Sequence, residues 1–311
     1  MKVIVDTDAG IDDAIALLMT LAHPAAEVLA VTTVMGNVSL EQATHNTGVI
    51  LDVAAAPDIP IFKGCARPLL QCVPPDAVSV HGADGLGGAG RPTTTRVPYS
   101  EPAGLALARL AREHPGQITL VTLGPLTNVA LAIQLDADFL VNLGQLVIMG
   151  GSIDGRGNTT PAAEFNFLVD PEAAAFVFAA CHRARIEAVL VSWETTLAHP
   201  VPLTSWDSLI TGAAPVAQFV QQMTGHVKRT WRSSNVFWPD PLAVAVALAP
   251  EIIGEQERRL VAVEPARVAS RGHTIVDYRF GPESAPNARL VRKVDGVKFQ
   301  NLLQQAVQQG G

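Results

Sequence analysis

Short apolar runs rich in β-branched residues alternate along the chain with longer stretches rich in Ala and Leu. The runs have the length of buried strands, and the stretches carry apolar residues at helical spacing. This alternation predicts βαβ units and an α/β fold: an open, mainly parallel sheet flanked by helices, with ligands bound at the C-terminal ends of the strands. The expected strands are 3–5, 28–33, 118–122, 146–149 and 188–191. The expected helices are 14–21, 42–55, 104–113, 126–135, 172–180 and a terminal amphipathic helix at 296–309.

Composition limits the classes of protein to which the chain can belong. Hydrophobic residues make up 48% of the 311 residues, which indicates a substantial core, and no internal repeat divides the chain. We therefore expect one domain spanning residues 1–311. The net charge of -7 argues against nucleic acid or an anionic membrane as the main partner.

The termini and cysteines suggest a compartment. No apolar run reaches membrane-spanning length, and the chain enters a strand at Val3, where a signal peptide would not fit. Cys65, Cys72 and Cys181 are odd in number and lack metal-site spacing. They are expected to be reduced thiols of a cytoplasmic protein.

Four aspartates crowd into eight positions after the first expected strand: Asp6, Asp8, Asp12 and Asp13. Asp12 or Asp13 alone is explained as well by a place at the positive end of the following helix, but one helix start accommodates only one or two acids. Such crowding raises carboxyl pKa values or recruits a cation. Gly10, and the lack of a later Glu, exclude an EF-hand loop. A hard cation, Ca²⁺ or Mg²⁺, is expected.

Polar residues recur beyond later strands, where they would share one edge of the sheet. Each signal is weak by itself: Asn37 follows Gly36 as turn residues do, and Thr127 or Asn128 is suited to capping a helix. Asp170 and Asp240 each precede a proline, which favours a helix-capping role on local sequence alone.

The glycine-rich segment 72–95 is expected to be a mobile loop rather than packed structure. His81 lies near its centre. A second mixed region, 225–239, contains His226 and several aromatic residues and is also expected to be mobile.

Taken together, these segments resemble the inosine-uridine preferring nucleoside hydrolase family over nearly the whole chain. The aspartate-rich start is that family's signature. Its companions here are segments 36–37, 81–87, 124–128, 149–151 and 164–166, together with Asp240. The resemblance implies hydrolysis of the N-glycosidic bond of a ribonucleoside to ribose and free base, in nucleoside salvage.

The resemblance also implies roles for single residues. Ca²⁺ would be held by Asp8, Asp13, the main-chain carbonyl of Leu123 and Asp240, so that Asp240 ligates as well as caps. Asp8 would be the general base that activates a metal-bound water, and the transition state would be oxocarbenium-like. Asp12 would bind a ribose hydroxyl. The remaining substrate contacts are expected from Asn37, His81, Met149, Asn158, Glu164 and Asn166.

One departure from the family concerns the leaving group. Many members carry a histidine directly before the late aspartate, and here that position is Pro239, which cannot protonate a departing base. His81 or His226 would be substitutes. Alternatively Trp231, Phe237 or Trp238 would stack on a purine. The base preference stays open between purine and pyrimidine.

Two other functions compete with the hydrolase. A phosphatase of the haloacid-dehalogenase type also opens with a strand and Asp-x-Asp, but that family wants Thr or Val where Gly10 stands. A non-catalytic ribonucleoside-binding protein would keep the ribose pocket and lose turnover. Relatives in the resembling family are commonly homodimers or homotetramers, which is the expectation for this chain.

Overall fold

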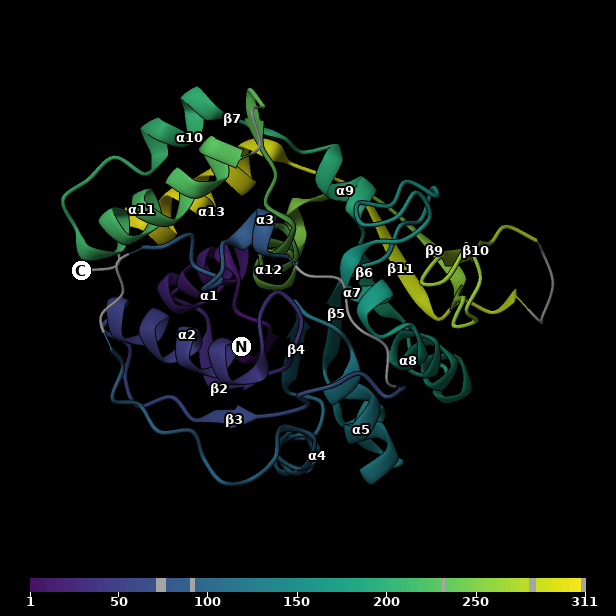
Figure 1. Ribbon diagram of the computed structural model, residues 1–311. Coiled ribbons are helices and arrows are strands. Elements are labelled where there is room, and N and C mark those ends of the chain that lie inside the picture. The colour runs from purple at the N-terminus through teal and green to yellow at the C-terminus, as the bar shows by residue number, and fades with distance from the viewer. Residues whose placement is uncertain (71–76, 90–92, 231–232, 280–283, 309–311) are drawn as a thin grey trace.

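The sheet at the centre of the molecule is mostly parallel (Figure 1). The structure is a computed structural model that describes residues 1–70, 77–89, 93–230, 233–279 and 284–308. Within these residues nine strands form one sheet in the order β10-β9-β11-β6-β5-β4-β1-β2-β3. The strands are β1 (Lys2–Thr7), β2 (Glu27–Thr33), β3 (Ile61–Lys63), β4 (Ile118–Thr122), β5 (Gln145–Met149), β6 (Ala188–Val191), β9 (Ile253–Val263), β10 (Thr274–Asp277) and β11 (Ala288–Val294). A separate antiparallel pair is formed by β7 (Val201–Pro202) and β8 (Asn235–Val236).

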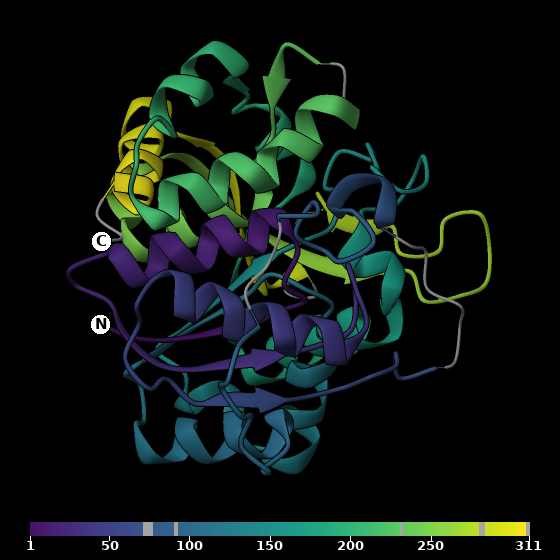
Figure 2. The ribbon, with the colours of Figure 1, turned by 60° about the vertical axis from the view of Figure 1, so that its left-hand side comes forward.

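Helices cover both faces of the sheet, as the turned view makes plain (Figure 2). One face is covered by α1 (Ile11–Ala22), α2 (Leu40–Val53), α11 (Pro215–Thr230), α12 (Pro239–Leu248) and α13 (Gly296–Gln308). The other is covered by α4 (Ala103–Glu113), α5 (Thr127–Leu135), α6 (Phe139–Asn142) and α8 (Pro171–Ala184). The remaining short elements are α3 (Val78–His81), α7 (Phe165–Val169), α9 (Trp193–Leu197), α10 (Leu203–Leu209) and the 3₁₀ turn Pro250–Ile252. Among the described helices, none is both long enough and apolar enough to cross a membrane.

Two apolar cores result from the alternation of side chains along the strands. Val3 and Val5 of β1 enter the core beneath α1 and α12, whereas Ile4 enters the core on the side of α4 and α5. All three are almost completely buried. A strand buried on both faces needs apolar residues at consecutive positions, which is why these runs were recognisable in the sequence.

The predicted α/β fold with a mainly parallel sheet is confirmed. All five expected strands exist, and β4 and β6 have the expected bounds. The expected helices exist with ends shifted by a few residues, and the terminal helix is confirmed as far as residue 308. The antiparallel pairs β9–β10 and β9–β11, which complete one edge of the sheet, were not predicted.

The connectivity places a crevice between β1 and β4. From β1 the chain builds β2 and β3 on one side, and it then returns to place β4 on the other side of β1. The loops that leave the C-terminal ends of β1 and β4 therefore diverge to opposite sides. In open α/β sheets this switch point is where ligands bind.

Candidate active site

The aspartate turn follows β1 at the switch point. α1 begins at Ile11, three residues earlier than expected, so Asp12 and Asp13 lie in its first turn. Asp13 accepts hydrogen bonds from the Thr7 hydroxyl and from the Gly10 amide at 2.8 Å. Asp13 therefore does support the helix start, and its carboxyl group also lies beside those of Asp8 and Asp240.

Asp8 is completely buried beside this turn. Its Oδ2 accepts the Asn37 backbone N–H at 2.7 Å, and its Oδ1 accepts the Asn37 side-chain amide at 3.1 Å. Gly36 makes the fit possible, because a Cβ at that position would lie 1.9 Å from Asp8 Oδ2. Asn37 is thus a partner of the carboxylate rather than only a turn residue. Burial, with the charge of Asp13, raises the pKa of Asp8 well above its usual range.

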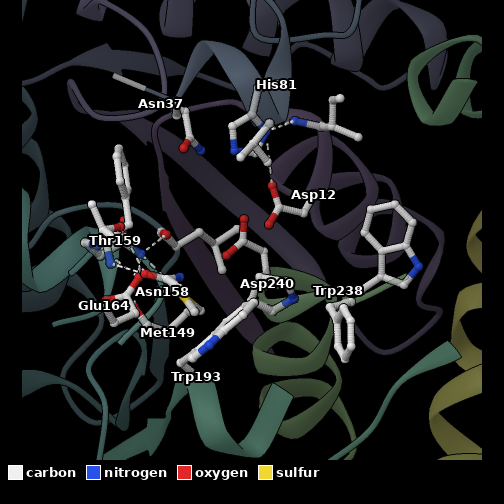
Figure 3. Close-up of a pocket in the computed structure, with 18 of the residues that line it drawn as sticks. Asp12, Asn37, His81, Met149, Asn158, Thr159, Glu164, Trp193, Trp238 and Asp240 are labelled. Atoms are coloured by element: carbon white, nitrogen blue, oxygen red, sulfur yellow. Dashed lines mark hydrogen bonds and ion pairs between the residues drawn. The ribbon is translucent and has the colours of Figure 1, made fainter. Parts of the chain in front are cut away.

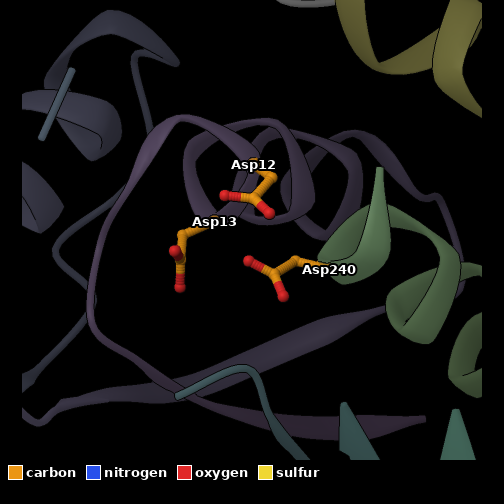
Figure 4. A group of neighbouring side chains, drawn as sticks. All are labelled: Asp12, Asp13 and Asp240. Atoms are coloured by element: carbon orange, nitrogen blue, oxygen red, sulfur yellow. The ribbon is translucent and has the colours of Figure 1, made fainter. Parts of the chain in front are cut away.

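Three carboxylates form a compact group that could hold a cation: Asp12, Asp13 and Asp240 (Figure 4). One oxygen from each lies within 4.8 Å of the others. The Oδ1 atom of Asp12 is buried, has no hydrogen-bond partner among the described residues and lies 3.6 Å from His81 Nδ1. Burial and neighbouring charge raise the pKa of Asp12 to about 8, and burial with the charges of Asp12, Asp13 and Asp8 raises that of Asp240. An all-oxygen, multiply acidic donor set with an orphaned carboxylate oxygen fits a hard divalent cation.

The capping expectation holds for one of the two Asp-Pro sites. Asp170 Oδ1 accepts the Ala173 N–H at 3.0 Å and caps α8. Asp240 does not cap, because α12 begins at Pro239 and has no side-chain cap. The caps considered for Thr127 and Asn128 are also absent, since α5 begins at Thr127 without a side-chain cap. Instead, the Asn128 amide donates to buried Asp6 at 2.7 Å.

A cavity of about 550 Å³ opens above the carboxylates (Figure 3). Nine of the eleven residues that the resemblance assigned to the metal and substrate line it: Asp12, Asn37, His81, Leu123, Met149, Asn158, Glu164, Asn166 and Asp240. Asp8 and Asp13 are not in its lining and lie buried below. Aromatic side chains of Phe165, Trp193, Phe237 and Trp238 complete the wall. The cavity therefore combines an acidic floor, amide groups and flat apolar surfaces.

His81 ends α3 and is buried, so the expectation that segment 72–95 lacks packed structure is wrong for residues 77–89. His81 Nδ1 accepts the Ile11 N–H at 3.1 Å, and Asn46 donates to the carbonyl of Asp84 at 2.9 Å. Gly82 and Gly85 have positive φ angles and form tight turns in a packed segment. Residues 71–76 and 90–92, with Cys72, lie outside the described residues. Cys65 and Cys181 are free thiols.

Glu164 and Asn166, which line the cavity, are held in place by hydrogen bonds to the backbone. Glu164 caps α7 and accepts N–H groups of Gly151, Asn166 and Phe167. Burial, opposed by these bonds, raises its pKa to about 7. The Asn166 amide donates to the Leu123 carbonyl at 2.6 Å, which leaves that oxygen a second lone pair for another partner.

Other proteins resemble the chain along nearly its whole length. A family model described as inosine-uridine preferring nucleoside hydrolase matches residues 3–301. The chain belongs to this family. The pyrimidine-specific ribonucleoside hydrolase RihA of Salmonella dublin is 35% identical, over 99% of this chain and 98% of the relative. Uridine nucleosidase 1 of Arabidopsis thaliana is 36% identical, over 89% and 82% of the two chains. A solved inosine-guanosine nucleoside hydrolase superposes with a TM-score of 0.93 at 34% identity and covers 98% of both chains.

Membership of the nucleoside hydrolase family confirms the enzyme class, an N-glycosidase of nucleosides, and makes the phosphatase alternative wrong.

His226, the other histidine considered as a proton donor to the leaving base, lies outside the cavity. His226 belongs to α11 rather than to a mobile region, and its buried Nε2 has no hydrogen-bond partner among the described residues. Trp231 lies outside the described residues.

Two contributors to this nucleoside hydrolase site were missed in the sequence. Trp193 lines the cavity and lies two residues after the end of β6, so the signal of a strand followed by polar or aromatic residues was present. Asn46 lies in the middle of α2 and donates to the carbonyls of Ala9 and Asp84. A mid-helix asparagine among threonines carries no local signal for such a role.

Proposed function

We propose that this chain is a Ca²⁺-dependent ribonucleoside hydrolase that releases ribose and free base in nucleoside salvage. The observation that carries the proposal is the carboxylate group of Asp12 and Asp240 on the floor of a cavity, with Asp13 buried beneath them, while the walls supply amides and aromatic surfaces. Breaking the C1′–N bond develops positive charge on the ribose, and an anionic floor stabilises that charge.

The cation would be held by Asp8, Asp13, the Leu123 carbonyl and Asp240, with Asp12 close enough to join them or to bind the ribose 2′-hydroxyl. When bound, Ca²⁺ would orient the ribose hydroxyls and acidify a water weakly. Asp8 takes a proton from the attacking water in this proposal, and Asn37 holds both Asp8 oxygens in place. Asn158, Glu164 and Asn166 would bind the other hydroxyls.

His81 would serve the departing base as a hydrogen-bond donor. Because its Nδ1 accepts a backbone N–H, the proton of the neutral ring is on Nε2. Burial lowers the pKa of His81 to about 4, so a neutral ring is expected at pH 7. Pro239 cannot protonate the departing base, so this donor and the aromatic side chains of the cavity wall would assist its departure instead.

The test is ribose release from inosine, adenosine, guanosine, uridine and cytidine, after chelation and after Ca²⁺ is restored. Release that chelation abolishes and Ca²⁺ restores supports the proposal. The order of the five substrates gives the base preference, since the relatives' names include both pyrimidine and purine nucleosides. 2′-Deoxyribonucleosides should be cleaved far more slowly, because a site built around a hydroxyl rejects its absence.

Failure to release ribose from any of the five would contradict the proposal. Tight binding without release would favour the non-catalytic ribonucleoside-binding protein. A cytoplasmic location and a homodimer or homotetramer remain part of the proposal, and light scattering of the purified protein would measure the number of subunits.

A further inference from the structure

The loop between β5 and α7 is fastened to the start of α9, which lies beside it (Figure 1). The Gly151 carbonyl accepts the Trp193 N–H at 3.0 Å. The next residue of α9, Glu194, accepts three backbone N–H groups of the loop: Ile153 at 2.8 Å, Asp154 at 3.1 Å and Arg156 at 3.1 Å.

One carboxylate therefore collects three amides from four consecutive residues. Residues 151–158 form no helix or strand, so these amides depend on side-chain partners. Hydrogen bonds to an ionised carboxylate are roughly twice as strong as neutral ones. Two further links lie beside these amides: the Ser152 N–H donates to the Thr274 hydroxyl at 3.0 Å, and Arg292 binds the Asp154 carboxylate at 2.8 Å. Glu194 is thus the side chain that fixes the backbone of residues 153–156.

The fastened backbone leads directly into the cavity. Gly157 follows Arg156, and a Cβ there would lie 2.0 Å from the Thr160 carbonyl, so the chain turns tightly at this point. Asn158 comes next and lines the cavity. Its Oδ1 accepts the Phe165 N–H at 2.9 Å, while its amide nitrogen has no protein partner within the described part of the chain. In Figure 3 Asn158 lies beside Glu164 and faces the carboxylates across the cavity.

The start of α9, which holds the loop, also positions an aromatic side chain of the cavity wall. Trp193 precedes Glu194 in α9 and lines the cavity, with its ring 6.3 Å from that of Phe237. Its own backbone N–H is part of the attachment to Gly151. The start of α9 therefore fixes the position of the loop that carries Asn158 relative to the ring of Trp193.

We propose that Glu194 is a positioning residue for ribonucleoside binding: from outside the cavity, it holds the backbone that presents Asn158 to the ligand. The proposal rests on the proposed function for the identity of the ligand. The attachment itself is independent of that identity.

The test compares Glu194→Gln and Glu194→Ala with the control Glu255→Gln. Glu255 lines a neighbouring surface cavity that Glu194 also lines, but it pairs with Lys293 and does not contact the loop. Hydrogen exchange of the Ile153, Asp154 and Arg156 amides should accelerate about tenfold or more in both Glu194 variants and stay unchanged in the control. The affinity for Ca²⁺, measured by calorimetry, should stay within about twofold, because no carboxylate of the floor belongs to this loop.

Kinetics then separate positioning from a general loss of structure. KM for ribonucleosides should rise about tenfold in Glu194→Ala, with a smaller change in kcat. Asn158→Ala should have a similar effect. If Glu194 acts through Asn158, the double variant should be no worse than Asn158→Ala by more than about twofold in kcat/KM.

Unchanged amide exchange in the Glu194 variants would overturn the attachment. Faster exchange with an unchanged KM, or fully additive losses in the double variant, would overturn the positioning role while leaving the proposed function intact. Absence of turnover in the unaltered protein would instead contradict the proposed function, and the exchange measurement would still decide whether the attachment exists.

Discussion

Ala9 has a φ angle of 43° in the turn between Asp8 and Gly10, a left-handed conformation that residues with a Cβ rarely adopt. Two contacts keep it there. Its N–H donates to the Thr7 hydroxyl at 3.0 Å, and its carbonyl accepts the Asn46 amide at 3.0 Å. Such strain persists only where surrounding contacts determine the backbone, as they do in this turn.

Replacement of Asn46 should therefore disturb the aspartate turn. Asn46→Leu leaves the buried carbonyl of Ala9 and the partly buried carbonyl of Asp84 without this donor, and the free energy of unfolding should fall by about 2 kcal/mol or more. The affinity for Ca²⁺ should also fall. Denaturant unfolding and calorimetry would measure the two effects. Thr47→Val is the control, because within the described part of the chain the Thr47 hydroxyl bonds only to the Ala43 carbonyl of the same helix. Wild-type Ca²⁺ affinity in Asn46→Leu would show that Ala9 does not depend on this contact.

His81 should remain neutral well below the pH at which a free histidine takes up a proton. Burial lowers its pKa to about 4. Its ring should therefore titrate near that pH in the protein without a bound cation, with the proton on Nε2 throughout the neutral range. Nitrogen-15 spectra of the imidazole report both the tautomer and the midpoint. A midpoint near 6.5, or a proton on Nδ1, would contradict the hydrogen bond from Ile11.

The free energy of unfolding should change over the pH range in which His81 takes up its proton. Because the folded pKa lies below that of the unfolded chain, the unfolded chain binds the proton first as the pH falls from about 6.5 to about 4. The His81 contribution to stability is therefore lost over that range. His81→Gln should remove this part of the pH dependence when the two proteins are compared by denaturant unfolding.

Separate elements bring the carboxylates at and beneath the cavity floor together: β1 leads to Asp8, α1 carries Asp12, and α12 carries Asp240. Folding alone thus creates the unfavourable crowding. In the protein without a cation, part of that charge is neutralised by protons, since burial raises the pKa of Asp12 to about 8.

Cation binding should therefore release protons and strengthen as the pH rises. Between about pH 6 and 8, the affinity should increase up to about tenfold per pH unit for each proton displaced. Calorimetry in buffers of different ionisation enthalpy counts the released protons. A pH-independent affinity with no proton release would show that the group is already fully ionised.

Whereas the cation affinity should rise with pH, the free energy of unfolding of the cation-free protein should fall as the pH rises. The Asp12 contribution is fully present below the ordinary carboxyl pKa of 3.8 and is lost as the pH rises towards 8. Bound Ca²⁺ should remove most of this dependence. Melting temperatures measured across pH, with and without Ca²⁺, test the sign.

The elements that the sequence revealed are those buried on both faces. β4 and β6 read as unbroken apolar runs and were located to the residue. β9 was not recognised as a strand, because Glu255, Glu257 and Arg258 project from an exposed edge region and interrupt the apolar pattern. Antiparallel strands solvated on one side carry only alternating apolar residues, which long charged stretches conceal.

For the candidate site, the sequence located residues in the segments that connect a strand to the next helix, or at the start of that helix. Asp12, Asn37 and Glu164 follow strand ends and do line the cavity. Glu194 lies in the same kind of position after β6, but its contacts are to a loop more than thirty residues earlier in the chain. Such a contact depends on which loops become neighbours at the sheet edge, which no local pattern specifies.

At the scale of the whole molecule, the two ends of the chain share one sheet and one core. β1 and β11 belong to the same sheet, and α13 packs against α1. Phe299, Leu303 and Val307 of α13 are buried in the core that also contains α1. We therefore propose that residues 1–311 fold as one domain.

Leu303→Ala should destabilise that domain as a unit. Removal of this fully buried side chain costs about 2–5 kcal/mol. Backbone circular dichroism and tryptophan fluorescence should shift together to lower denaturant concentration, with one coincident transition. A transition that splits, with part of the signal unchanged, would show that the chain contains two independently folding units.

The parallel strands give the molecule two unlike ends. The cavity lies at the C-terminal ends of β1 and β4, whereas the exposed turn at residues 115–117 precedes β4 at its N-terminal end. Five strand residues separate this turn from the site, roughly 17 Å at the usual rise per residue. A bead, an electrode or a fluorescent label attached at that turn would leave the mouth of the cavity facing the solution. The protein could thus be immobilised in one orientation and used as a reusable sensor surface for nucleosides.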